Sequence, residues 1–535
     1  MAQAVKTRTG GHVVAETLET LGAEVVFGVP GIHALPIWEG LRTGPVRAVG
    51  FRSELNAGFA ADGFARVSGR PAPLLLSTGP GALISLGALM EAASSHVPVV
   101  AIASQIPSDL LGRGRGYLHE LPNQLASFAP VVKWAARAGR AEAIPELLAE
   151  AWRRALTPPG GPVFVEIPVD LLMRPTHAGV GELDPTPNAL PLPNVEEAAR
   201  LLNEARRPVI WAGGGVLRSG AWEELAELAR RLDAPVATTY MGKGAFPEDD
   251  PLSAGSASDE SAFVELVEDA DVLLCVGTEL GAETTQQYGL APSGRIVQID
   301  AAPERIGATY PALGLVGDAR ALLEALLEGV RPWPADGAER AARVRRRIAS
   351  GLEAQGHELE RGLLETIRAA LPRDAVHAWD MTILAYWAAA HFPALAPRRF
   401  LYPLGSGTLG YAWPASLGAS LATPGTRMLA VAGDGGILYG LQELATAHQH
   451  GIGAVLLVVD DGGYGILREY QRDSFGETTA VDLARPDFAA VARAFDVPAE
   501  ATTPDALGEA LARAFAHEGP AVIHLPTRLE MWSPT

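Results

Sequence analysis

The sequence predicts an α/β protein of three domains, each built on a doubly wound parallel sheet with helices on both faces. Short apolar runs alternate with amphipathic helical stripes along most of the chain, which is the pattern of parallel strands joined by crossover helices. The length of 535 residues permits roughly three domains on the usual size range. Proline-rich and highly charged stretches divide the chain into residues 1–178, 197–330 and 361–535.

The first domain begins with a strand that leads into the turn Gly28-Val29-Pro30-Gly31. A helix is expected to follow this turn and to run through Gly40. The helix predicted over 53–69 is rich in alanine and glycine, so we expect it to pack closely against another helix or a second subunit. Further strands are predicted at 46–51, 74–77, 97–103 and 161–171, with a helix over 82–95.

Residues 174–196 are rich in proline and lack periodicity, which predicts a linker. The stretch 207–239 then predicts a strand, a glycine turn, a helix and a strand. A glycine turn alone only weakly indicates a dinucleotide site, and no acidic residue stands at a clear ribose-binding position. The single cysteine, Cys275, lies in an apolar run that predicts a buried strand. Residues 331–360 are highly charged and predict a solvated helical connector.

The third domain contains the stretch around which the rest is organised, residues 428–467. An apolar run over 428–432 predicts a strand, and Gly433 to Gly436 predict a tight turn. Apolar residues at three- and four-residue steps predict a helix that begins at Ile437 and ends before Gly451. A second strand is predicted over 454–459, which completes a right-handed parallel βαβ unit.

Two carboxylates follow these strands, Asp434 after the first and Asp461 after the second. Both are therefore expected at the carboxyl edge of one sheet, where ligands of open α/β sheets bind. With Asp460 adjacent, these acids repel one another unless a cation such as Mg²⁺ or Ca²⁺ neutralises them. The amides that begin the next helix suit a phosphate. The sequence predicts a metal-bridged phosphate site; the alternative is an ordinary turn with aspartates in a solvated loop.

The segment from Gly433-Asp434-Gly435-Gly436 to the paired acids and GGYG resembles the signature of thiamine diphosphate enzymes, in the branch of pyruvate decarboxylase, benzoylformate decarboxylase and acetolactate synthase. The resemblance implies pyrimidine-binding, middle and diphosphate-binding domains, with metal ligands from Asp434, Asp461 and the Gly463 carbonyl. Asp460-Asp461 stands where Asn-Asn is usual, so cofactor affinity is expected to depend steeply on metal concentration. The resemblance places further cofactor contacts at Pro30, Gly31, Thr382, Gly433, Gly435, Gly436, Gly465 and Ile466.

Glu54 begins the stretch ELNAGFAADGFAR, which resembles the family segment whose glutamate bonds the aminopyrimidine ring. On the residues alone, a first-turn glutamate favoured by the helix dipole is the better explanation. The resemblance implies that Glu54 shares a proton with the ring and so helps to form the C2 ylid. The segment 404–422 also resembles the family, with Leu409 as the wedge between the cofactor rings and the Gly407 carbonyl as acceptor for the amine.

His119, in GYLHELPNQ, is either a surface histidine or a group that transfers protons. The resemblance makes the second role as good an interpretation as the first, because pyruvate decarboxylases have a paired histidine near this position. Those enzymes also have a glutamate where this chain has Leu467, so His119 is the expected proton donor. Glu283 and Gln287 of the middle domain are weaker candidates for the site. The expected substrate pocket consists of Ile32, His33, Ser77, Ile466, Leu467 and Tyr470.

Composition excludes several classes of partner. A net charge of −19 argues against nucleic acid, and there is no apolar span long enough for a membrane helix. The N-terminal stretch MAQAVKTRTGG lacks the apolar core of a secretory signal, so a cytoplasmic location is expected. The resemblance implies a homodimer or homotetramer with the active site between subunits. The stretch 251–263 lacks the glycine- and histidine-rich segment of flavin-binding members, so FAD is not expected.

Within the family, the stretches 27–41 and 112–126 look most like decarboxylases of larger 2-oxo acids, including 5-guanidino-2-oxopentanoate decarboxylase. We therefore expect non-oxidative decarboxylation of a medium or large 2-oxo acid through a C2 ylid and an enamine. A carboligase of the acetolactate synthase type is the main alternative. An oxidase would need flavin. A catalytically silent homologue that only binds cofactor is disfavoured by Glu54, Leu409 and Asp434.

Overall fold

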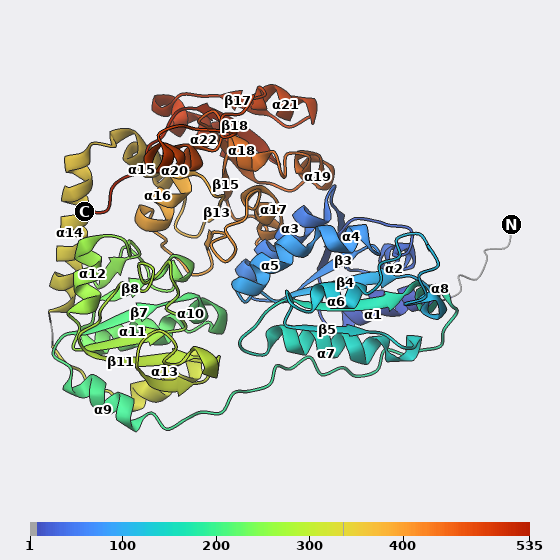
Figure 1. The fold of residues 1–535 in the computed structure, drawn as a ribbon, viewed down its shortest axis with the longest axis horizontal. Helices are drawn as coiled ribbons and strands as arrows, with labels where there is room; N and C mark the ends of the chain where they lie inside the picture. Colours follow the sequence, from blue (N-terminus) through green and yellow to red (C-terminus); the bar gives the residue numbers. More distant parts are fainter. Residues whose placement is uncertain (1–7, 335) are drawn as a thin grey trace.

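The computed structural model describes residues 8–334 and 336–535. It contains three six-stranded sheets, each made of parallel strand pairs, and helices cover the faces of each sheet (Figure 1). The fold class predicted from the sequence is confirmed. None of the helices in these residues is long and apolar enough to cross a membrane.

The N-terminal sheet has the strand order β2-β1-β3-β4-β6-β5. Its strands are β1 (Val25–Gly28), β2 (Arg47–Gly50), β3 (Ala72–Leu76), β4 (Val99–Gln105), β5 (Trp134–Arg137) and β6 (Val163–Pro168). Its helices are α1 (Gly10–Thr20), α2 (Leu35–Arg42), α3 (Glu54–Ser68), α4 (Pro80–Ile84), α5 (Leu86–Ser94), α6 (Gln124–Phe128), α7 (Ile144–Leu156) and α8 (Val169–Met173). The single helix predicted over 82–95 is wrong, because the chain forms two helices that meet at Ser85.

The middle sheet has the order β12-β11-β10-β7-β8-β9. Its strands are β7 (Pro208–Ala212), β8 (Val236–Thr238), β9 (Ser253–Gly255), β10 (Val272–Val276), β11 (Arg295–Asp300) and β12 (Leu313–Val316). Its helices are α9 (Glu196–Glu204), α10 (Gly214–Ser219), α11 (Trp222–Leu232), α12 (Ser261–Glu268) and α13 (Ala319–Gly329). The charged helix α14 (Gly337–Gln355) follows, and it is not simply solvated, because Ala341, Val344 and Ile348 are buried.

The C-terminal sheet has the order β14-β13-β15-β16-β18-β17, which repeats the topology of the N-terminal sheet. Its strands are β13 (Val376–Trp379), β14 (Phe400–Leu401), β15 (Met428–Gly433), β16 (Val455–Asp460), β17 (Ala499–Ala501) and β18 (Ala521–Pro526). Its helices are α15 (Glu358–Ala370), α16 (Ile383–His391), α17 (Ala412–Ala422), α18 (Asp434–Ile437), α19 (Glu443–His450), α20 (Gly465–Phe475), α21 (Phe488–Ala494) and α22 (Leu507–Ala516).

The helix predicted to begin at Ile437 is wrong in its bounds. A short helix begins at Asp434 and ends at Ile437, and α19 begins only at Glu443. Asn56 of the N-terminal domain donates a hydrogen bond to the Tyr439 carbonyl (3.2 Å) in this break, and another to the Glu443 carboxylate (3.1 Å). A carbonyl freed by the break is thus bonded from another domain, which the periodicity of the segment could not reveal.

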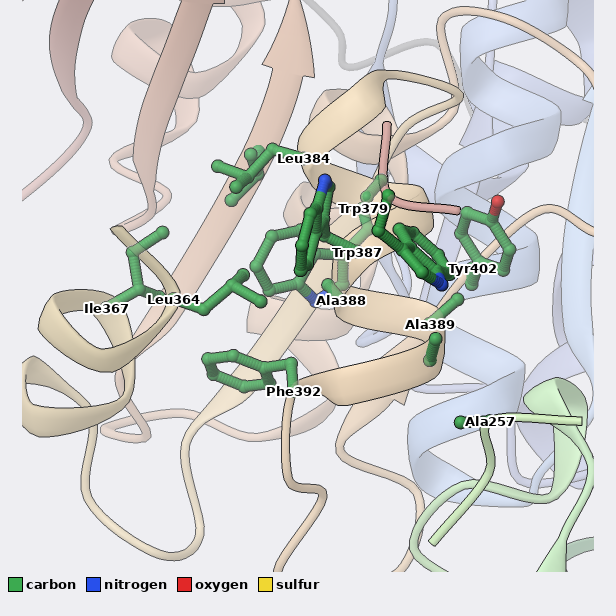
Figure 2. Close-up of a cluster of buried hydrophobic side chains, with 14 of the residues drawn as sticks. Ala257, Leu364, Ile367, Trp379, Leu384, Trp387, Ala388, Ala389, Phe392 and Tyr402 are labelled. Atoms are coloured by element: carbon green, nitrogen blue, oxygen red, sulfur yellow. The ribbon is translucent and has the colours of Figure 1, made fainter. Parts of the chain in front are cut away.

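The C-terminal domain shares an apolar core with each of the other two. One cluster joins the core around Trp379 and Trp387 to middle-domain residues such as Ala257 (Figure 2). A second cluster of buried apolar residues joins the C-terminal domain to the N-terminal domain, where α3 packs against α17. Figure 1 shows the C-terminal domain between the other two at the top of the molecule.

Helices α3 and α17 approach closely through glycine. A methyl group added at Gly418 would fall on the carbonyl oxygen of Ala60, and one at Gly63 would fall on that of Ala415. The alanine- and glycine-rich helix therefore packs against another helix of its own chain. This contact holds the N-terminal and C-terminal domains together.

We predict that Gly418→Ala lowers the free energy of unfolding by about 1–3 kcal/mol, because the added methyl must push two backbones apart. Thermal unfolding followed by calorimetry measures the effect. Gly362→Ala is the control, since it adds a methyl to another helix where nothing lies within 4 Å, and it should stabilise by about 0.5–1 kcal/mol. Equal melting temperatures for the two variants would contradict the close approach.

Candidate active site

Asp434 and Asp461 lie at the carboxyl edge of the C-terminal sheet, at the ends of the adjacent strands β15 and β16. Asp434 is only 2% exposed, yet neither of its carboxylate oxygens has a hydrogen-bond partner. Asp461 Oδ1 is also buried without a hydrogen-bond partner. Burial, followed by the charges of Asp461 and Asp460, raises the pKa of Asp434 to about 7. Such a pair of acids is costly unless a cation joins it.

Asp460, in contrast, has its own hydrogen-bond partners. His524 Nε2 lies 2.9 Å from Asp460 Oδ2, and Arg485 Nη1 lies 3.2 Å from Oδ1. The Gly462 amide also donates to Oδ1 at 3.2 Å. Since its charge is met by these groups, Asp460 is not a free third acid beside Asp434 and Asp461.

The two free carboxylates fit a divalent cation with oxygen ligands. In the described residues no cluster of three or more His, Cys, Asp or Glu side chains is arranged to hold a metal, so a third protein ligand would have to be a backbone oxygen, as predicted for Gly463. Gly463 has φ of 146°, and Gly465 lies so close to Asp461 that an added methyl would meet its carboxylate. Glycine at 465 therefore lets the backbone pass close to the Asp461 carboxylate.

The loop with Gly407 and Leu409 lies at the same edge and is held by Asp380, the residue after β13. Asp380 accepts hydrogen bonds from the Gly410 amide (3.1 Å) and the Ala412 amide (3.4 Å). Its burial raises its pKa to about 6. Asp380 carried no predicted role, although an acid directly after a strand at this edge is the signal that indicated Asp434. Thr382 lies beside Gly433.

A second group of predicted residues meets at the carboxyl edge of the N-terminal sheet. The rings of His33 and His119 lie 5.4 Å apart in an edge-to-face arrangement. His33 Nδ1 lies 3.0 Å from Thr78 Oγ1, and burial followed by the charge of His119 lowers its pKa. Ser77 Oγ and His119 Nδ1 are buried without hydrogen-bond partners. These two polar atoms are available for a ligand.

Glu54 lies in the first turn of α3, beside the same group. An added methyl at Gly81 would lie 2.8 Å from Glu54 Oε1 and 3.2 Å from Ser77 Cβ. Burial raises the pKa of Glu54, as expected for a carboxyl that holds a proton. Gly31 lies against Ser77 and follows Pro30, so the structure brings the N-terminal candidates together.

The N-terminal and C-terminal groups do not meet through Glu54 within one chain. Among the described residues, no hydrogen bond joins Glu54 to Asp434 or Asp461, and Glu54 is not among the groups that shift the pKa of either aspartate. In the described part of one chain, Glu54 and the acid pair therefore belong to two groups with no hydrogen bond between them.

The predicted pocket residues of α20 differ in exposure. Ile466 is buried in the core, whereas Leu467 and Tyr470 are about half exposed. Burial raises the pKa of Tyr470, and the charges of Glu283, Glu469 and Asp259 raise it further. Acids of the middle domain therefore lie near the exposed face of α20. Ile32 is exposed on the N-terminal domain.

A cavity of about 200 Å³ lies elsewhere, where the three domains meet. It adjoins the topological switch point of the middle sheet, between β7 and β10, where open α/β sheets bind ligands. Its lining includes Gly214, Gly215, Arg218, Gly277 and Asp300 from the middle domain and Arg66 and Ser95 from the N-terminal domain.

Family models of the thiamine pyrophosphate enzymes match three parts of the chain. The N-terminal TPP binding domain matches residues 8–127, the central domain 195–326 and the C-terminal TPP binding domain 380–525. A probable 2-ketoarginine decarboxylase, AruI of Pseudomonas aeruginosa, is 39% identical over 92% of this chain and 89% of its own length.

Acetolactate synthases are also similar to this chain. The probable large subunit from Methanocaldococcus jannaschii is 31% identical over 96% of this chain and 91% of its own length. The acetolactate synthase of Mycobacterium bovis is 32% identical over 92% of this chain and 83% of its own length.

We predict that Mg²⁺ raises the melting temperature of the wild-type protein and not that of Asp434→Asn, because only the wild type has the full acid pair that the ion would join. Without divalent ions, Asp434→Asn should melt at a higher temperature than wild type, since it removes one repelling charge. Differential scanning fluorimetry with and without EDTA measures both shifts. Asp505→Asn, at an exposed acid in the short 3-10 helix Pro504–Ala506, should behave as wild type. An equal Mg²⁺ response in all three proteins would contradict the assignment.

Proposed function

Because the chain belongs to the thiamine pyrophosphate enzyme family, we propose that it binds thiamine diphosphate with Mg²⁺ or Ca²⁺ and decarboxylates a medium or large 2-oxo acid without oxidation. The observation that carries this proposal is the acid pair: buried Asp434 has no hydrogen-bond partner on either carboxylate oxygen, and neighbouring Asp461 has none on its buried Oδ1. We propose these carboxylates and the Gly463 carbonyl as the metal ligands. We propose that Gly433, Gly435 and Gly436, in the turn after β15, bind the diphosphate at the same edge.

The proposed chemistry divides between the cofactor and the side chains. Thiamine diphosphate, when bound, supplies the electron sink for the bond that breaks as carbon dioxide leaves. Glu54 holds a proton at its half-buried carboxyl, which its raised pKa supports. His119, whose Nδ1 has no protein partner, is the proposed proton donor to the product carbon. His33 packs against the His119 ring and helps to hold it in place.

We propose that the substrate has a cationic side chain. The similarity to a probable 2-ketoarginine decarboxylase supports this proposal. The charged surroundings of Tyr470 support it independently, because Glu283, Glu469 and Asp259 all act on its phenol. Asp259 also accepts a hydrogen bond from Tyr240 Oη at 2.9 Å. A guanidinium that enters between α20 and the middle domain would meet these acids.

The test is carbon dioxide release and product identity for a panel of 2-oxo acids, with thiamine diphosphate and Mg²⁺ and no added flavin. We expect 5-guanidino-2-oxopentanoate to give carbon dioxide and the corresponding aldehyde. Neutral acids of similar length should have a kcat/KM lower by roughly tenfold or more, since they lack one charged hydrogen-bonding group. No turnover of any 2-oxo acid, despite bound cofactor, would refute the function.

Glu283→Gln separates the substrate class from the reaction. It should raise KM for the guanidino acid by about tenfold and leave the KM of neutral acids unchanged. Glu518→Gln, an exposed acid of the C-terminal domain, is the matched control. If Glu283→Gln left the KM of the guanidino acid unchanged, the cationic preference would have another source.

A carboligase is the second candidate function. The acetolactate synthases that are 31% and 32% identical favour it. Formation of acetolactate from pyruvate in the same assay would decide for this alternative. FAD is not part of either proposal, and a yellow colour of the purified protein would contradict that expectation.

We propose that the working unit is a homodimer or homotetramer whose active site lies between subunits. The absence of a hydrogen bond between Glu54 and the acid pair in the described residues agrees with this arrangement, because a second chain could then supply one of the two groups. Exposed apolar side chains on both domains also support it: Ile84, Met90, Leu438, Tyr439 and Phe475. A cytoplasmic location is proposed as well, supported by the absence of any disulfide at the single, buried Cys275.

Mixed oligomers test the shared site. Glu54→Gln alone should lower kcat by about 10²–10⁴-fold, and Asp434→Asn alone should be inactive at low Mg²⁺. When the two variants are co-expressed and purified as a mixture, random pairing should restore roughly one quarter of the wild-type activity. No restoration, with mixed oligomers demonstrated by two affinity tags, would place the whole site within one chain.

A further inference from the structure

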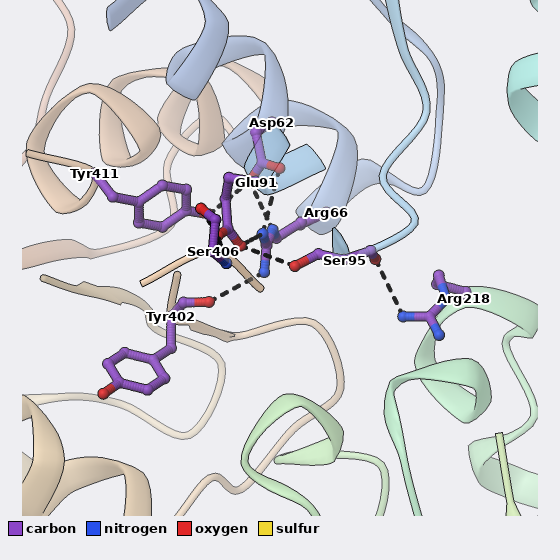
Figure 3. Close-up of polar contacts among 8 residues, drawn as sticks. All are labelled: Asp62, Arg66, Glu91, Ser95, Arg218, Tyr402, Ser406 and Tyr411. Carbon is purple, nitrogen blue, oxygen red and sulfur yellow. Dashed lines mark hydrogen bonds and ion pairs between the residues drawn. The ribbon is translucent and has the colours of Figure 1, made fainter. Parts of the chain in front are cut away.

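Glu91, on α5 of the N-terminal domain, is fully buried and accepts four hydrogen bonds from three residues (Figure 3). Its two carboxylate oxygens face different elements. One oxygen binds groups of its own domain, and the other binds a loop of the C-terminal domain. A carboxylate without exposure to water requires such partners.

Oε2 of Glu91 holds the loop that contains Gly407 and Leu409. The Ser406 amide donates to it at 2.7 Å and the Ser406 hydroxyl at 2.8 Å. Gly405 lies so close that an added methyl would be 2.5 Å from Ser95 Oγ and 2.9 Å from Glu91 Oε1. The carboxylate therefore binds the backbone of this loop at close range, one residue before Gly407.

Oε1 of Glu91 is tied to α3. Arg66 Nη2 donates to it at 2.7 Å and Ser95 Oγ at 2.8 Å. The same guanidinium donates to Asp62 at 2.6 Å and to the Tyr402 carbonyl at 3.2 Å. The Tyr411 hydroxyl completes the set by donating to Asp62 at 2.7 Å.

The segment 402–411 is thus fastened to the N-terminal domain at three points. The Tyr402 carbonyl is its first point, Ser406 is the middle one, and the Tyr411 hydroxyl is the last. Asp380 of its own domain binds only the end of the segment, at Gly410. Glu91 is therefore the group that fixes the middle, where the predicted cofactor contacts lie.

We propose that Glu91 is a positioning residue for the cofactor: from the N-terminal domain it holds Ser406, and thereby sets where the Gly407 carbonyl and the Leu409 side chain stand. The proposal rests on the proposed function, which assigns this loop to the aminopyrimidine end of thiamine diphosphate. Glu91 itself touches neither substrate nor cofactor in this arrangement, and acts only through the loop.

The test is Glu91→Gln in the full-length protein. An amide can accept on one side only, so either the Ser406 pair or the Arg66 and Ser95 pair loses its acceptor, while Arg66 keeps its ion pair with Asp62. We expect hydrogen exchange of the amides in 404–409 of the cofactor-free protein, measured by mass spectrometry, to become about tenfold faster. The Kd for thiamine diphosphate at saturating Mg²⁺, measured by calorimetry, should rise about tenfold.

Ser95→Ala is the matched control. It removes one donor from the same carboxylate and leaves both Ser406 contacts, so loop exchange and cofactor affinity should stay within about twofold of wild type. If Glu91→Gln does not fold, Ser406→Ala replaces it. That variant removes one loop contact and leaves α5 unchanged, and both quantities should then change by about fivefold.

Unchanged loop exchange in both Glu91→Gln and Ser406→Ala would overturn the proposal. Faster exchange with an unchanged Kd would also overturn it, because Glu91 would then hold the loop without serving the cofactor. A wild-type protein that binds no thiamine diphosphate at any Mg²⁺ concentration would refute the proposed function and this role with it. The exchange measurement in the cofactor-free protein distinguishes that failure from a loop that Glu91 does not hold.

Discussion

The contact between α3 and α17 is the constraint on which the arrangement of the site depends. The two helices meet backbone to backbone at glycine, so they allow little relative movement. Glu54, Asp62 and Arg66 all lie on α3, and α17 directly follows the loop with Leu409. A single rigid crossing therefore fixes the N-terminal acids of α3 relative to the C-terminal loop of the same chain.

The acids of the two domains differ in whether a neighbouring group pairs with their charge. Arg66 joins two buried carboxylates, and Asp460 is met by His524 and Arg485. At the same sheet edge, Asp434 has no hydrogen-bond partner on either carboxylate oxygen, and Asp461 has none on Oδ1. The fold thus satisfies the acids that support the structure and leaves unsatisfied those that fit a metal ion, a contrast typical of functional sites.

Part of the fold and of the candidate site was predictable from local sequence, and part was not. Alternating apolar runs and glycine turns predicted the parallel sheets, and the acids after two successive strands predicted the pair at one edge. The stripe after Ile437 predicted a continuous helix, yet the chain breaks there and the Tyr439 carbonyl bonds to Asn56. Periodicity describes which face is apolar, but it does not reveal where a distant residue supplies a competing hydrogen bond.

The sequence by itself determined the three parallel sheets and the position of Asp434 and Asp461, because strand succession and the residue after each strand are local properties. Only the tertiary structure decided that Asp460 binds His524 rather than joining the pair, and that Glu91 holds Ser406. The residues of these contacts are separated by 64 and 315 positions. Such partners are chosen by the packing of whole domains, which no local pattern specifies.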